Sequence, residues 1–160
     1  MRLRLFLTQI AALSATCLGS NTVQAEENSV SSFGVNVATH VLYHELAHAL
    51  IREFHLPVLA NEEAMADTFS TVAVTLWHRD SAPSIIHDRV RSWLFEDSQV
   101  LPENYDFKGE HLLDIRRAYQ AGCLFYGLDP AEFTDHVAFL EFSKHDLAEC
   151  SDTAPDQQAS

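Results

Sequence analysis

The chain has 160 residues, 47% of them hydrophobic and 21% charged, which fits one globular domain with one core. Its 23 acidic residues outnumber its 10 basic residues, so the formal net charge is −13. A surface this acidic repels phosphate groups. We therefore expect no nucleic acid among its partners.

The first 25 residues have the pattern of an export signal peptide. Arg2 and Arg4 precede a mostly apolar run over residues 5–18, and Val23-Gln24-Ala25 would provide a cleavage site. The apolar run is too short and too interrupted to span a membrane. We expect a signal peptide over residues 1–25 and a secreted or periplasmic mature protein, with no stable membrane span after signal removal.

The rest of the chain predicts a mostly α fold, a single compact helical domain over residues 26–150 with little or no sheet. Helices are expected at about 36–54, 61–77, 81–96, 110–126 and 130–142. The Ser- and Asn-rich stretch Glu26–Phe33 is expected to be flexible, and residues 151–160 to form a disordered polar tail. The first helix is apolar at most positions, so we expect it to be buried at the centre of the domain.

The first predicted helix contains His44-Glu45-Leu46-Ala47-His48, an HExxH motif. Residues four apart project from one face of a helix, so the two imidazoles can bind one metal ion. Glu45 is rotated away from that line, where it is poorly placed as a ligand but able to accept a proton from water. His40 forms a competing pair with His44, and a chain with 9 histidines can contain the motif by chance.

The beginning of the second predicted helix carries two carboxylates on one face, Glu63 and Asp67. If the two helices pack antiparallel, Glu63 could be the third ligand and Asp67 could accept a hydrogen bond from a ligand imidazole. Glu62 is the fallback ligand. The alternative is that these acidic residues only compensate the dipole at the helix N-terminus.

HExxH followed by ExxxD resembles the gluzincin metallopeptidases. The run from Tyr43 through Asp67 is similar to a bacterial family of metallopeptidases of unknown function, and the similarity continues through His111–Asp114 and Cys123–Gly127 to Cys150. The resemblance implies a zincin-like domain built around the HExxH helix, a Zn2+ cofactor and a peptide or protein substrate. It implies the zinc ligands His44, His48 and Glu63, the base Glu45 and the second carboxylate Asp67. It also implies a longer segment before the motif than this chain has.

Hydrolysis of a peptide bond builds negative charge on the carbonyl oxygen, and a hydrogen-bond donor must stabilise that charge. His111 is the first candidate, because it is expected at the start of the fourth helix with Asp114 three residues later. The runners-up are Tyr43, Tyr105 and Tyr119.

Removal of a signal peptide would leave two cysteines, Cys123 and Cys150. In an oxidising compartment these two would form a disulfide, and the alternative is two free buried thiols.

Three functions follow from these features. The first is a secreted zinc-dependent metallopeptidase that hydrolyses peptide bonds with zinc-activated water and Glu45 as general base. The second is a zinc-binding, catalytically inactive metallopeptidase-like interaction module, because the short segment before His44 leaves little chain to form a substrate cleft. The third is a metal-free helical interaction protein in which HExxH is accidental.

Overall fold

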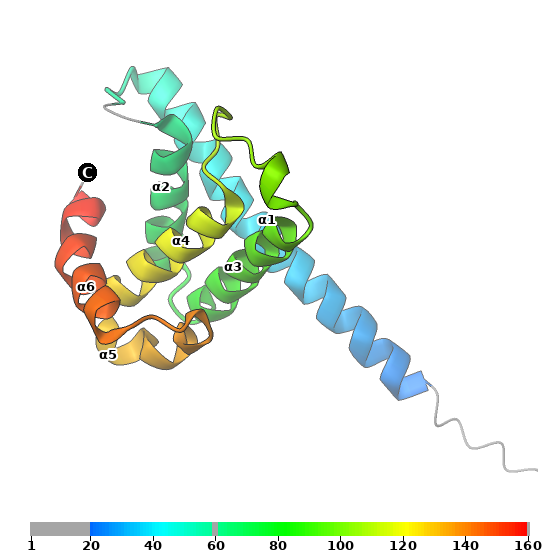
Figure 1. The fold of residues 1–160 in the computed structure, drawn as a ribbon. Coiled ribbons are helices and arrows are strands. Elements are labelled where there is room, and N and C mark those ends of the chain that lie inside the picture. The colour runs from blue at the N-terminus through cyan, green and yellow to red at the C-terminus, as the bar shows by residue number, and fades with distance from the viewer. Residues whose placement is uncertain (1–19, 59–60, 160) are drawn as a thin grey trace, which may run out of the picture.

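The computed structural model describes residues 20–58 and 61–159, with side chains described from residue 32 onward. Within these residues the chain forms six α-helices and no strand, which confirms the predicted mostly α fold. The helices are α1 (Ser20–Phe54), α2 (Glu62–Trp77), α3 (Ala82–Ser98), α4 (Asp114–Leu128), α5 (Pro130–Phe133) and α6 (Lys144–Ala159) (Figure 1).

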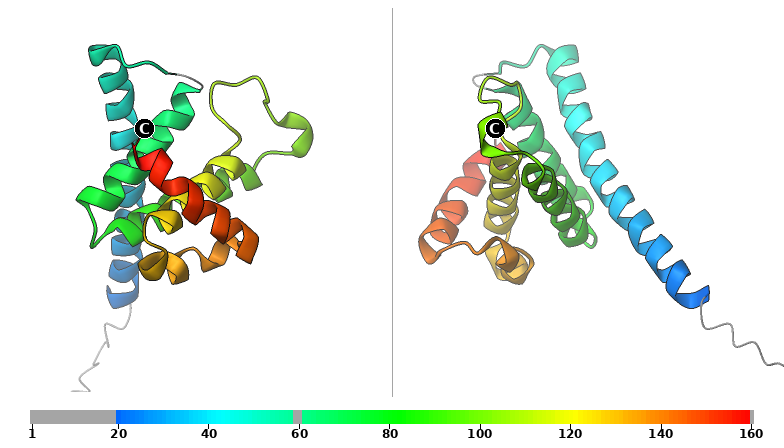
Figure 2. Two further views of the ribbon diagram at one scale, coloured as in Figure 1. Left: turned by 90° about the vertical axis from the view of Figure 1, so that its left-hand side faces the viewer. Right: turned by 45° about the vertical axis from the view of Figure 1, so that its right-hand side comes forward.

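The first helix is longer than the sequence predicts. α1 begins at Ser20 and has 35 residues, a length of about 50 Å. The stretch Glu26–Phe33, expected to be flexible, is therefore helical, as are residues 20–25 of the predicted signal peptide. Residues 1–19 of that peptide lie outside the described part of the chain. The N-terminal part of α1 projects away from the other helices (Figure 1 and Figure 2).

The expectation that the motif helix is buried at the centre is wrong. α1 packs along α2 and α3 and buries a narrow stripe that includes His40, His44 and Ala47. On its outer side Leu42 is 67% exposed and Phe54 66% exposed. A helix buries only what its neighbours cover, and here the neighbours cover one side. No helix in residues 20–58 and 61–159 is both long and apolar enough to cross a membrane.

The hydrophobic core lies where α2, α3 and α4 meet and is closed by α5 and the turns after it. Trp93 of α3, Phe125 of α4 and Phe133 of α5 are fully buried, and the rings of Phe125 and Phe133 stack at 4.0 Å. Together with buried Val74 of α2, these large side chains hold α4 against α2 and α3. As a result, the first turn of α4 faces polar residues of α2.

The fifth predicted helix is shorter than expected. α5 ends at Phe133, and two 3-10 turns follow, Thr134–His136 and Ala138–Leu140. Glu141 then adopts a left-handed backbone conformation with φ of 54°, which reverses the chain and leads into α6. The helical pattern over residues 130–142 therefore reflects a series of tight turns.

The C-terminal segment is also ordered, contrary to expectation. α6 continues to Ala159, through most of the stretch predicted to be a disordered tail. The expected disulfide is present: Cys123 of α4 and Cys150 of α6 are bonded, with their Cα atoms 5.1 Å apart. One turn further on, buried Ala154 packs against Gly127, where an added Cβ would lie 2.6 Å from the Ala154 Cβ and would collide with the Cys150 carbonyl. The bond and this close approach hold the end of the chain on α4.

Candidate metal centre

The turn between α1 and α2 places the two halves of the candidate site side by side. Asn61 caps α2, because its side-chain oxygen accepts a hydrogen bond of 2.8 Å from the backbone N–H of Ala64. Its amide group donates to the Glu110 carbonyl at 2.8 Å, which ties the loop before α4 to the same point. As a result the first turn of α2 and this loop both face the HExxH part of α1.

Three potential ligand atoms converge there. His44 Nε2 lies 3.1 Å from His48 Nε2 and 3.0 Å from Glu63 Oε2, and His48 Nε2 lies 3.3 Å from Glu63 Oε2. Donors that share one small tetrahedral ion at about 2.0–2.1 Å are separated by roughly 3.3 Å. Among the described residues, His44, His48 and Glu63 form the group of histidine and acidic side chains that could hold a metal ion.

On the side of each imidazole away from the other ring, the Nδ1 atom contacts a carboxylate of α2. His44 Nδ1 donates to Asp67 Oδ1 at 2.9 Å, and His48 Nδ1 donates to Glu62 Oε1 at 2.7 Å. A neutral imidazole has one N–H, so both Nε2 atoms are then acceptors that face the Glu63 carboxylate. A metal ion among these three acceptors would satisfy all of them at once, whereas without a metal ion a proton on one imidazole has to do so. The donor set, two imidazoles and one carboxylate, is one that zinc binds.

The negative charge of Glu62 also acts on His48. Its hydrogen bond is the main cause that raises the pKa of His48 above the usual value. Glu62, the fallback ligand, therefore lies on the Nδ1 side of His48, and Glu63 lies on the Nε2 side. The side chain of Glu62 is 45% exposed and that of Glu63 17% exposed, so Glu63 is the more enclosed of the two.

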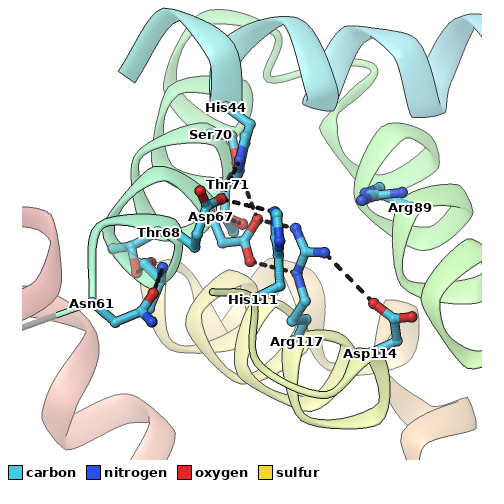
Figure 3. Close-up of polar contacts among 12 residues, drawn as sticks. His44, Asn61, Asp67, Thr68, Ser70, Thr71, Arg89, His111, Asp114 and Arg117 are labelled. Atoms are coloured by element: carbon cyan, nitrogen blue, oxygen red, sulfur yellow. Dashed lines mark hydrogen bonds and ion pairs between the residues drawn. The ribbon is translucent and has the colours of Figure 1, made fainter. Parts of the chain in front are cut away.

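Asp67 is held on two sides (Figure 3). It accepts the His44 hydrogen bond and, in addition, two from Arg117: Nε to Oδ2 at 2.8 Å and Nη2 to Oδ1 at 3.0 Å. Burial alone would raise the pKa of Asp67, but the hydrogen bonds from His44 and Arg117 outweigh it and lower the pKa to about 2. Asp67 is thus a carboxylate at neutral pH, and the hydrogen of the contact belongs to His44 Nδ1.

His111 lies in the loop before α4, three residues ahead of the helix start at Asp114, so it does not open the helix as expected. Its Nε2 is 2.8 Å from Glu63 Oε2, and its half-exposed ring stacks 6.2 Å from that of His44. His111 also borders a hollow of about 440 Å3 lined by the loop and the start of α4. It therefore sits beside the three ligand atoms, at the edge open to solvent.

Of the three tyrosines considered beside His111, only Tyr105 borders the same hollow. The Tyr43 hydroxyl contacts His78 Nε2 at 2.8 Å, and the Tyr105 hydroxyl donates to Asp97 at 3.3 Å. Tyr119 borders a different cavity, between α2, α4 and α6.

Glu45 lies on the exposed side of α1. One residue along a helix is a rotation of about 100°, so its side chain leaves α1 in a different direction from that of His44. This position keeps Glu45 outside the ligand group and accessible to a molecule that approaches from solvent.

Two relationships were not anticipated from the sequence: the hydrogen bond from His48 to Glu62 and the role of Arg117. Arg117 is 50 positions after Asp67, and no local pattern pairs the two residues. Only its place in the predicted fourth helix, after Asp114, was available as a signal.

One of three comparisons with known proteins found a match. No curated protein and no solved structure matches the chain significantly. A family model, DUF4344, described as "Putative metallopeptidase", matches residues 9–159, which includes every residue of the candidate site. The chain therefore belongs to this metallopeptidase family, and its His44, His48 and Glu63 form a group that could bind the metal.

Proposed function

We propose that the protein is an exported zinc-dependent metallopeptidase of the gluzincin type. In this proposal His44, His48 and Glu63 hold the zinc ion, and Asp67 fixes the orientation of His44. The observation that carries the proposal is the convergence of three acceptor atoms within 3.0–3.3 Å of one another, with the imidazole protons directed to Asp67 and Glu62. When bound, zinc would supply Lewis acidity toward water and a peptide carbonyl.

The remaining steps would be carried by side chains of the chain itself. Glu45, exposed and next to His44 in the chain, would accept a proton from the attacking water and pass it to the leaving amine. His111, at the open edge beside Glu63, would donate a hydrogen bond to the carbonyl oxygen as it becomes negative. The disulfide between Cys123 and Cys150 supports export, since such bonds persist in oxidising compartments.

A second candidate function is a zinc-binding, catalytically inactive interaction module. The outer face of α1 favours it, because Leu42 and Leu46, on either side of Glu45, are 67% and 38% exposed. Exposed apolar side chains of this size are suited to contact with another protein. Both candidates require the same metal ligands, so metal binding does not separate them.

The test compares wild type with Glu45→Gln on a mixture of peptides and unfolded proteins, with zinc measured on the same samples. The amide has a similar shape but cannot accept the proton, so turnover should fall about 10²- to 10⁴-fold while zinc stays bound. Chelator-sensitive cleavage by wild type alone supports the peptidase. Zinc-loaded but inert wild type supports the interaction module, and equal cleavage by both proteins overturns the proposed role of Glu45.

A further inference from the structure

Two arginines stack on the same buried tryptophan, and only one of them reaches the candidate metal centre. The guanidinium carbons of Arg89 and Arg117 lie 4.0 Å and 4.7 Å from the centre of the Trp93 ring. Both arginines are 9% exposed and Trp93 is fully buried. Their packing environments are therefore closely matched.

Their polar contacts differ. Arg89 donates to Ser92 at 3.3 Å and lies 3.8 Å from Glu96, both on its own helix. Arg117 presents Nε and Nη2 to the two carboxylate oxygens of Asp67, and its Nη1 lies 3.5 Å from Asp114 Oδ1. Figure 3 shows the Arg117 side chain between these two carboxylates, with Asp67 in turn against His44.

A paired arginine–carboxylate contact fixes the plane of the carboxylate as well as its position, because a guanidinium donates through two parallel N–H groups. Asp67 Oδ1 is shared between Arg117 Nη2 and His44 Nδ1. The orientation of the imidazole therefore depends on a carboxylate whose own orientation Arg117 sets. The stacking of the Arg117 guanidinium on the Trp93 ring limits the movement of Arg117.

We propose that Arg117 is a positioning residue for the metal centre: it holds Asp67 so that His44 keeps its proton on Nδ1 and presents Nε2 toward Glu63 and His48. The proposal rests on the proposed function, since it concerns a metal held by His44. Arg117 itself contacts none of the three ligand atoms and acts through Asp67. Residues that orient a ligand imidazole typically change metal affinity about 10- to 100-fold when they are replaced.

The experiment uses the full chain and zinc alone. Zinc affinity is measured by competition with a chromophoric chelator for wild type, Arg117→Lys, Arg117→Met and the matched control Arg89→Met. Nitrogen-15 NMR of the metal-free proteins reports which ring nitrogen of His44 carries the proton. Thermal unfolding of each variant measures the loss of packing on Trp93.

The Arg117 variants should bind zinc about 10- to 100-fold more weakly than wild type, Met more weakly than Lys, and the Nδ1–H state of His44 should no longer predominate. Arg89→Met should lose comparable stability yet keep its zinc affinity within threefold. Lysine retains the charge and most of the stem, so Arg117→Lys serves if the methionine variant does not fold.

Equal zinc affinity in the Arg117 and Arg89 variants would overturn the inference and leave the proposed function standing. An unchanged His44 tautomer in the Arg117 variants would overturn it as well. Absence of zinc binding by wild type would refute the proposed function, and the inference would fall with it.

Discussion

Two histidines one turn apart on α1 face α2 in very different surroundings. His40 and His44 are both buried, with 1% and 6% of their surface exposed. His40 meets hydroxyl groups, with Ser70 Oγ at 3.0 Å and Thr71 Oγ1 at 3.2 Å from its Nε2. His44 meets carboxylates, Asp67 at Nδ1 and Glu63 at Nε2.

The partners on α2 therefore decide what each imidazole does. Burial, aided by the positive charge of Arg89, lowers the pKa of His40 to about 3, so this histidine is a neutral core residue with its hydrogen bonds satisfied. His44 lies where carboxylates gather and is joined by a second imidazole. The sequence leaves the pair His40/His44 as an alternative metal site. In the structure the ring nitrogens of His40 contact hydroxyl groups, and the carboxylates contact His44 instead.

The largest effect should come from replacing His44, and replacing His40 serves as the comparison in the same metal-binding assay. Wild type should bind one zinc per chain, and His44→Ala should lose more than about 100-fold in affinity, because it removes a proposed ligand rather than a residue that orients one. His40→Gln should bind zinc as wild type does. Elemental analysis after dialysis measures both, and loss of zinc from the His40 variant but not from the His44 variant would reverse the assignment.

Removal of the disulfide tests whether zinc affinity depends on the contact between α4 and α6. Cys123→Ser combined with Cys150→Ser removes a link across 27 residues, which corresponds to about 3.5 kcal/mol of stability. Urea unfolding should show this loss, while zinc affinity of the folded protein should stay unchanged. A parallel loss of zinc affinity would mean that α6 also positions the ligands. Intact mass before and after reduction confirms the bond in the natural protein.

His40 makes a specific contribution to pH-dependent stability. In the unfolded chain its pKa is near 6.5, and in the folded protein it is about 3, so the unfolded state binds more protons between these values and stability falls as the pH drops below 6.5. Between pH 7.5 and pH 5.0 the contribution is about 2 kcal/mol. His40→Gln should lose this dependence when the free energy of unfolding is measured with chelator present at both pH values. An identical pH dependence in wild type and variant would show that His40 is not held neutral.

The smallest expected effect is the difference in zinc affinity between variants of the neighbouring residues Glu62 and Glu63. Glu63→Gln alters a proposed ligand atom, whereas Glu62→Gln only weakens the hydrogen bond between Glu62 and His48. We expect about a tenfold loss of zinc affinity at Glu62 and a clearly larger loss at Glu63. Chelator competition on both variants decides, and the opposite ranking would make Glu62 the ligand.

The candidate metal ligands His44, His48 and Glu63 could be picked out from the sequence because their geometry is local. The four-residue step from His44 to His48 places two imidazoles on one helix face, and Asn61 marks the start of α2 so that Glu63 and Asp67 fall on one face as well. These rules operate within one or two helical turns. The helical fold class was predictable for the same reason.

The distant partners were not predictable in this way. Arg117 reaches Asp67 only because Trp93 and the core place the first turn of α4 against α2, and His111 reaches Glu63 only because Asn61 binds the loop that carries it. Both contacts depend on packing between segments about 50 residues apart, for which the sequence holds no periodic signal.

The sequence by itself determined the helical fold class, the HExxH and ExxxD spacing and the cysteines available for a disulfide, because hydrogen bonding and side-chain periodicity act between near neighbours. Only the tertiary structure decided that α1 lies on the outside with Leu42 exposed, that the polar C-terminal segment is helical, and which carboxylate faces each histidine. Burial is a property of what packs against a residue, and those neighbours come from elsewhere in the chain.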